Sequence, residues 1–191
     1  MHSQSCSDCK KIIYKLLADS FGPNNVITQY NLDIPCFLQG YKTHPYFSTL
    51  VQIEAKLKSY RGFKEFTAKR RLSPVDYFVS SLGLIIEFDE SQHFTKPRAL
   101  TLEMYPKSLK LCFNRQRWLQ LCAEFNRHDN SPPYRDEQRA FYDTLRDFAP
   151  VFLGLPPIVR IYAGATVWCH LDQSKGIEVL FPHIPQLSHF F

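Results

Sequence analysis

The chain has 191 residues, of which 45% are hydrophobic and 15% aromatic. This composition excludes a disordered chain and suits a single domain, residues 1–191, with a substantial core. The net charge of +5 is compatible with a polyanionic partner but does not identify one. Residues 1–6 lack the apolar segment of a signal peptide, and no stretch is long enough for a membrane-spanning helix. We therefore expect a cytoplasmic protein with no membrane partner.

The first third of the chain predicts two helices and a strand. Residues 10–21 carry apolar side chains at helical spacing, and the Gly-Pro step that follows ends this helix. Residues 26–32 alternate and predict a strand. Residues 50–57 predict a second helix, with Leu50, Ile53 and Leu57 facing inward.

The middle of the chain predicts a hairpin that ends in a group of polar residues. Residues 75–79 form a short strand-like piece and residues 84–86 an apolar run of strand type, separated by a Ser-Ser step and a glycine. Acids follow the second run directly, and the first run contains Asp76. Pairing of the two strands would bring Asp76 beside the acids of the second strand.

The remainder of the chain predicts an α/β fold. Residues 107–127 and 134–148 have helical periodicity, and residues 158–163 form a strand. Residues 166–169 and 177–181 are expected to be two further strands around a turn, within a C-terminal segment of strands and loop, residues 165–191. The expected architecture is a mixed central sheet flanked by helices, with a core over about residues 10–164.

The acids of the hairpin predict a metal site. Residues two apart in a strand share a face, so Glu87 and Asp89 point the same way, toward Asp76 on the neighbouring strand. Three carboxylates suit Mg²⁺ or Mn²⁺, which would activate a water for attack on a phosphodiester. Gln92 or His93 would orient that water or transfer its proton. The alternative is a strand that runs out into solvent, with His93 incidental.

Two basic stretches predict contacts to nucleic acid. In the first, from Lys56 to Arg71, aromatic rings interleave the cations, as in proteins that pair with phosphates and stack on bases, and the second, from Lys107 to Arg117, adds another basic surface. The alternative is an ordinary solvated face. The cationic residues concerned are Lys56, Lys58, Arg61, Lys64, Lys69, Arg70, Arg71, Lys107, Lys110, Arg115 and Arg117.

The six cysteines are expected to be free thiols, because disulfides are rare in cytosolic proteins. Cys112 and Cys122 stand in apolar helical surroundings and fit small core positions. Cys6 and Cys9 have the spacing of half a zinc site, but no second pair follows at matching spacing. Plain thiols are therefore favoured, and a metal site at this pair remains open.

With its order of elements around Asp76 and the run Glu87-Phe88-Asp89 followed by His93, the chain resembles the PD-(D/E)XK, or restriction-endonuclease-like, nuclease superfamily. Within it, the very short patch repair endonucleases and related enzymes are most similar. The resemblance implies that Asp76 and Glu87 bind the metal, that Asp89 replaces the usual lysine, and that His93 is the general acid and base.

The same resemblance implies supporting residues farther along the chain. Asp136 and Arg139 would be the acid and the arginine that the branch often places on the next core helix, and Arg160 on the following strand fits its pattern. The implied activity is that of a Mg²⁺-dependent (or Mn²⁺-dependent) endonuclease acting on DNA, with RNA as an open alternative and a homodimer as a possible assembly. The competing functions are a nuclease-like module that binds nucleic acid without cutting it, and an interaction domain with surface acids.

Overall fold

A computed structural model describes residues 7–67, 72–182 and 188. Its centre is one four-stranded sheet in the order β1 (Val26–Tyr30), β2 (Val75–Val79), β3 (Leu84–Asp89) and β4 (Val159–Tyr162). The first three strands pair antiparallel, and β4 pairs parallel to β3. The mixed sheet flanked by helices that the sequence predicts is therefore confirmed.

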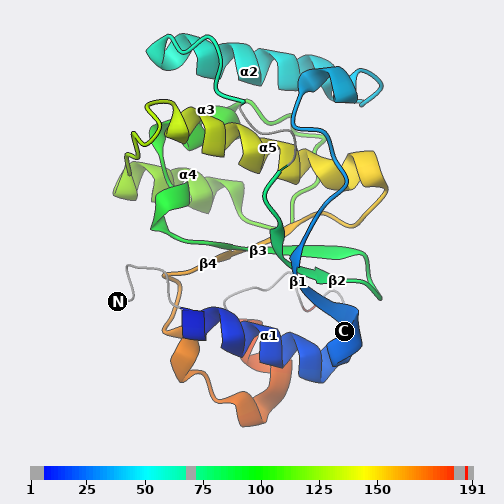
Figure 1. The fold of residues 1–191 in the computed structure, drawn as a ribbon. Helices are drawn as coiled ribbons and strands as arrows, with labels where there is room; N and C mark the ends of the chain where they lie inside the picture. Colours follow the sequence, from blue (N-terminus) through cyan, green and yellow to red (C-terminus); the bar gives the residue numbers. More distant parts are fainter. Residues whose placement is uncertain (1–6, 68–71, 183–187, 189–191) are drawn as a thin grey trace.

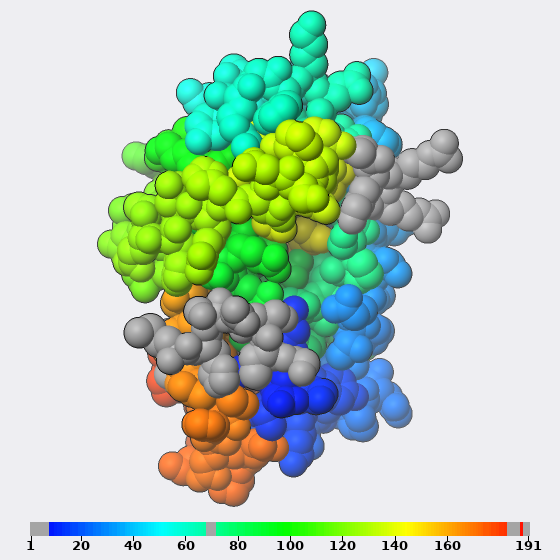
Figure 2. Space-filling model, turned by 60° about the vertical axis from the view of Figure 1, so that its left-hand side comes forward, coloured from blue at the N-terminus to red at the C-terminus, as the bar shows by residue number. Residues whose placement is uncertain are grey.

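Helices cover both faces of the sheet (Figure 1). One face carries α1 (Ser7–Phe21) and the C-terminal 3₁₀ helices η4 (Trp168–His170) and η5 (Gln173–Leu180); the other carries α3 (Lys96–Glu103), α4 (Arg115–Phe125) and α5 (Arg135–Leu153). The outermost layer is α2 (Phe47–Arg61), which lies beyond α3 and α5. Figure 2 shows the same order on the surface, with α2 at one end and α1 with the C-terminal helices at the other. Short 3₁₀ helices complete the described chain: η1 (Pro23–Asn25), η2 (Leu38–Tyr41) and η3 (Ser91–His93).

The strands divide the core in two. In β3, Leu84, Ile86 and Phe88 belong to the cluster under α1, whereas Ile85 belongs to the cluster formed with α2, α3, α4 and α5. This alternation follows from the period of two in a strand. None of the helices in the described part of the chain combines the length and apolarity needed to cross a membrane.

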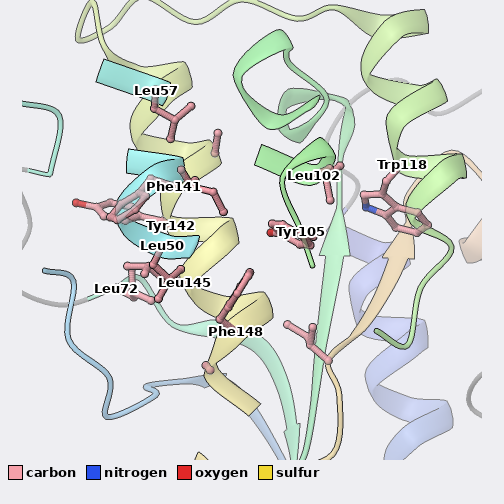
Figure 3. Close-up of a cluster of buried hydrophobic side chains, with 14 of the residues drawn as sticks. Leu50, Leu57, Leu72, Leu102, Tyr105, Trp118, Phe141, Tyr142, Leu145 and Phe148 are labelled. Carbon is pink, nitrogen blue, oxygen red and sulfur yellow. The ribbon is translucent and has the colours of Figure 1, made fainter. Parts of the chain in front are cut away.

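The helix α5 lies between the sheet and α2 and is buried over most of its length. Phe141, Leu145 and Phe148 form its apolar stripe, in keeping with the helical periodicity of residues 134–148, and pack with Leu50 and Leu57 of α2 (Figure 3). The same helix also buries charged residues, and a buried charge is costly unless it is paired. Each buried charge on α5 therefore needs a partner on a neighbouring element.

Two predictions about the second half of the chain are wrong. Residues 166–169 and 177–181 form no strands but lie in or beside η4 and η5. Their apolar residues are spaced for a 3₁₀ helix instead, because Ile177 and Leu180 are three apart and both buried in the cluster with α1. The helix expected over residues 107–127 is shorter, since the Asn114 side chain caps α4 by accepting from the N–H of Arg117.

Candidate active site

The strands β2 and β3 separate at Asp76. The last pair of their ladder is Tyr77 with Ile86. Beyond it, the Asp76 Oδ2 atom accepts a hydrogen bond from the Phe88 N–H at 2.9 Å, and Glu87 Oε2 accepts from the Asp76 N–H at 3.4 Å. The two carboxylates thus take the place of backbone acceptors where the strands diverge. Asp76 lies beside Glu87, as the hairpin predicts.

Each of the three predicted acids has a cation of the chain beside it. Lys10 Nζ on α1 lies 2.7 Å from Asp76 Oδ1. Arg146 Nε on α5 lies 2.9 Å from Glu87 Oε1.

Asp89 is held more completely than the other two acids. Its Oδ1 atom pairs with Arg160 Nη1 at 2.7 Å, and its Oδ2 atom accepts from the Trp118 indole N–H at 2.7 Å. Glu87 and Asp89 share the sheet face that meets α5, while Phe88 lies in the opposite cluster against Trp168. The predicted alternation is therefore confirmed.

The three acids do not combine into one set of metal ligands. Within residues 7–67, 72–182 and 188, no group of three or more His, Cys, Asp or Glu side chains is arranged to hold a metal ion. Asp76 and Glu87 meet, but Asp89 is committed to Arg160 and Trp118. The structure thus places Asp76 and Glu87 side by side through their hydrogen bonds to backbone N–H groups, where the sequence predicts a set of three acids.

Burial and neighbouring charges shift the pKa of Glu87 from its ordinary value. Burial raises the pKa of Glu87 to about 7; Arg146 lowers the value and Asp76 raises it. An acid with such a pKa gains and loses its proton near neutral pH, which is common at functional sites.

His93 is oriented by a carboxylate from α5. Its Nδ1 atom lies 2.9 Å from Asp143 Oδ2 and 3.9 Å from Asp89 Oδ1. Burial disfavours the imidazolium, but the Asp143 carboxylate outweighs burial and raises the pKa of His93. Burial alone would raise the pKa of Asp143, whereas His93 and Arg160 hold it well below its usual value. With Nδ1 bonded to Asp143, Nε2 is the ring nitrogen available to a ligand.

Gln92 points elsewhere. Its side chain donates to Glu90 Oε2 at 3.2 Å, and its backbone carbonyl accepts from Arg139. Of the two residues predicted to handle the proton, only His93 contacts the acid network.

Among the described residues, neither Asp136 nor Arg139 contacts the Asp76 or Glu87 carboxylate. Asp136 accepts from the Asp129 N–H at 3.1 Å, and Arg61 Nη2 lies 3.8 Å from its carboxylate. The acid and arginine of α5 that reach the site are Asp143 and Arg146. They stand seven residues later, two turns along the same helical stripe.

A second set of charges lies deeper, between α5, α3 and β4. Asp147 accepts from Arg98 at 2.6 Å, from Arg160 at 2.7 Å and from the Tyr105 hydroxyl at 2.7 Å. Sequence reasoning missed Lys10, Arg98, Asp143, Arg146 and Asp147 in this network. The available signal was the repeat of charged residues at positions 143, 146 and 147 on a helix with an apolar stripe.

Two pockets reach this region. One, of about 290 Å³, is lined by Lys10, Tyr14, Gln29 and Asp76 among others. The backbone of Gln29 has φ of 51°, and its amide lies 3.5 Å from Asp76 Oδ1. The other, of about 170 Å³, includes His93 and Arg146. The partners of both carboxylates are therefore accessible from the surface.

The predicted nucleic-acid contacts divide into paired and exposed cations. Lys58 pairs with Glu54, Arg61 with Glu137 and Arg117 with Glu124, while Arg115 donates to the Tyr105 carbonyl. Exposed cations without a carboxylate partner among the described residues are Lys56, Lys64, Lys107 and Lys110. Because α2 forms the outermost layer (Figure 1), Lys56 and Lys58 lie far from the sheet. Lys69, Arg70 and Arg71 lie outside the described residues.

The predicted cysteine pair remains a prediction. Cys9 is buried in the cluster under α1, and Cys6 lies outside the described residues. Cys122 is buried on α4, as expected, whereas Cys112 is half-buried and lies before α4, in an isolated bridge with Val159.

Comparison with protein-family models, with curated proteins and with solved structures finds no match to this chain.

Proposed function

We propose that this chain is a metal-dependent DNA endonuclease that hydrolyses phosphodiester bonds at the carboxylate pair Asp76 and Glu87. The observation that carries the proposal is that Asp76 lies beside Glu87 where β2 and β3 separate, with the Glu87 carboxylate accepting from the Asp76 N–H. The element order of helix, strand, hairpin, helix and strand, on which the resemblance to the PD-(D/E)XK superfamily rests, supports it.

The donor set fits Mg²⁺ or Mn²⁺ held by two protein ligands. Mg²⁺ usually takes one or two carboxylates and completes its coordination with waters and phosphate oxygens. Asp76 and Glu87 would hold the ion, and Asp89 would not. At this position an ion would supply a water of lowered pKa and a polarised phosphate.

The chain itself contributes a proton carrier. His93 is fixed through Nδ1 by Asp143, so Nε2 can accept a proton from a water or give one to the leaving oxygen. Asp143 keeps the tautomer and orientation of the ring constant and is a positioning residue in this proposal.

Incubation of supercoiled plasmid with the protein and Mg²⁺ or Mn²⁺ tests the proposal. Wild type is expected to nick or linearise the plasmid with the metal and not with EDTA. Glu87→Gln is expected to abolish cutting, because the amide cannot replace a carboxylate ligand. The matched control is Glu124→Gln, which changes an exposed acid paired with Arg117 on α4. Equal cutting by Glu87→Gln and Glu124→Gln contradicts the proposal.

A second candidate is a module that binds nucleic acid without cutting it. The observation in its favour is that Lys10, Arg146 and Arg160 already lie within 3 Å of the three acids. Built-in cations can neutralise such acids without a metal. Retarded plasmid in a gel, without nicking in any metal tested, would favour this candidate over the enzyme.

A further inference from the structure

The pocket of about 170 Å³ beside the carboxylate pair has a distinctive charge. It lies between the first half of α5, the 3₁₀ helix η3 and the residues before β2. Among the residues that the structure describes, three arginines and a histidine line it, and no carboxylate does. The residues that matter here are Arg135, Arg139, Arg146, His93, Gln138 and Tyr142.

Contacts to neutral groups help to hold two of these arginines, Arg135 and Arg139, in place. Arg135 donates to the Ser131 carbonyl at 3.1 Å and to the Gln138 side-chain oxygen at 3.0 Å. Arg139 donates to the Gln92 carbonyl at 2.9 Å. Hydrogen bonds to neutral acceptors fix a guanidinium without cancelling its charge, so little ordering remains to be done when an anion binds.

Carboxylates balance the pocket only in part. Arg139 also pairs with Asp129, and Arg146 pairs with Glu87 and Asp143. Arg135 has no carboxylate within ion-pair distance among the described residues. His93 adds positive charge when it is protonated, and its Nε2 atom is available to a ligand. The pocket wall therefore favours an anion.

We infer that this pocket binds one phosphate group of a nucleic acid, next to the bond that is cut. Guanidinium groups match the oxygens of a phosphate in bidentate geometry, and a small concave site of several arginines selects phosphate over weaker anions. The first turn of α5, which contributes Arg135, adds the positive end of its helix dipole. The identity of the polymer rests on the proposed function, whereas the phosphate rests on the pocket alone.

Two sources could supply this phosphate: the backbone of an uninterrupted strand, or a terminal phosphate monoester. Fluorescence anisotropy in EDTA, where no metal-dependent cutting takes place, distinguishes them. The probes are one fluorescent DNA with a 5′-phosphate, the same DNA with a 5′-hydroxyl, and a closed circle without ends. The variants are Arg135→Gln and Arg139→Gln, and the matched control is Arg127→Gln, an exposed arginine outside the pocket. Thermal melts verify that each variant is folded.

Each pocket variant is expected to bind about tenfold more weakly than wild type, the effect of one lost charge-assisted contact. The slope of the logarithm of its binding constant against the logarithm of the salt concentration should become shallower, by the equivalent of about one phosphate contact. A loss on all three probes assigns the backbone, and a loss confined to the 5′-phosphorylated probe assigns the terminal group; both support the pocket.

Equal losses in Arg135→Gln, Arg139→Gln and Arg127→Gln, or no loss in the first two, overturn the inference. The plasmid assay is independent of this result. If wild type cuts no plasmid but the pocket variants still lose binding, the proposed function fails and the phosphate site stands.

Discussion

The charges between α5 and the sheet form two halves that differ in access to water. The inner half comprises Asp89, Arg98, Asp147 and Arg160, whose side chains are at most 2% exposed. In the outer half, the side chains of Lys10, Asp76, Glu87, His93 and Arg146 are between 9% and 34% exposed. The same residue types therefore meet different dielectric surroundings within one network.

The charges of the inner half stabilise the fold, whereas those of the outer half can serve a function. In the inner half, two carboxylates face two guanidinium groups, and the indole of Trp118 and the hydroxyl of Tyr105 occupy further lone pairs. Such a set tolerates burial because its charge is balanced and its oxygen atoms are hydrogen-bonded. In the outer half, Glu87 has a raised pKa and pockets reach its neighbours, so this half can exchange protons and ligands.

The largest expected effect is from breaking the inner half at Asp147. Asp147→Asn removes the charge that pairs with both Arg98 and Arg160 and leaves them buried. We expect a loss of about 3–5 kcal/mol in the free energy of unfolding, measured by urea denaturation. Glu124→Gln, on the exposed pair with Arg117, should cost about 1 kcal/mol or less. A loss below about 1 kcal/mol for Asp147→Asn would mean that the inner half contributes little to stability.

The next effect is a pH dependence that comes from Glu87. The pKa of Glu87 is about 7 in the fold against 4.5 ordinarily. Between these values the folded state holds an extra proton, so stability falls as pH rises and the full cost is present above pH 7. Wild type should therefore lose on the order of 2–3 kcal/mol relative to Glu87→Gln as pH rises through that interval. Urea unfolding of both proteins at several pH values measures the difference, and a constant difference contradicts the assignment.

The outer half and the inner half also differ in how far the sequence predicts them. The contact between Asp76 and Glu87 follows from a hairpin, since paired strands bring residues eleven positions apart together. The pairs of Asp147 with Arg98 and of Asp89 with Arg160 span 49 and 71 positions. No local periodicity encodes such distances, because the packing of α5 against α3 and β4 decides them. Arg160 was expected at the site only through the family resemblance.

The C-terminal segment shows another limit. An apolar run beside a glycine predicts a strand, but a strand needs a partner with free backbone groups. The described residues 165–182 pack on α1 as 3₁₀ turns, with Trp168 buried and Gly176 at φ of 62°. The choice between a strand and 3₁₀ turns depends on α1, which already covers this face of the sheet.

A smaller effect concerns the proton on His93. The groups that face it are Asp143 on α5, Asp89 on β3 and Arg160 on β4, and Asp143 raises its pKa. The chemical shift of the ring, followed by NMR, should titrate with a midpoint above 6.5, and Asp143→Asn should lower that midpoint. The stability that protonated His93 contributes is full below its unfolded pKa and is lost as pH rises through the folded pKa. A midpoint that Asp143→Asn leaves unchanged would contradict the role of Asp143, with Glu124→Gln as the control.

The smallest effect is expected at Lys10, and it tests whether the outer half contributes less to stability than the inner half. Lys10 is the most exposed member of the outer half, at 34%, so water and salt screen its pair with Asp76. Lys10→Gln should cost about 0.5–1 kcal/mol in urea unfolding, and less at high salt. Asp76 tolerates the change because it still accepts from the Phe88 N–H. A cost as large as that of Asp147→Asn would show that the outer half is also structural. The fold cannot depend so strongly on Lys10 if a metal ion is to replace this cation at Asp76.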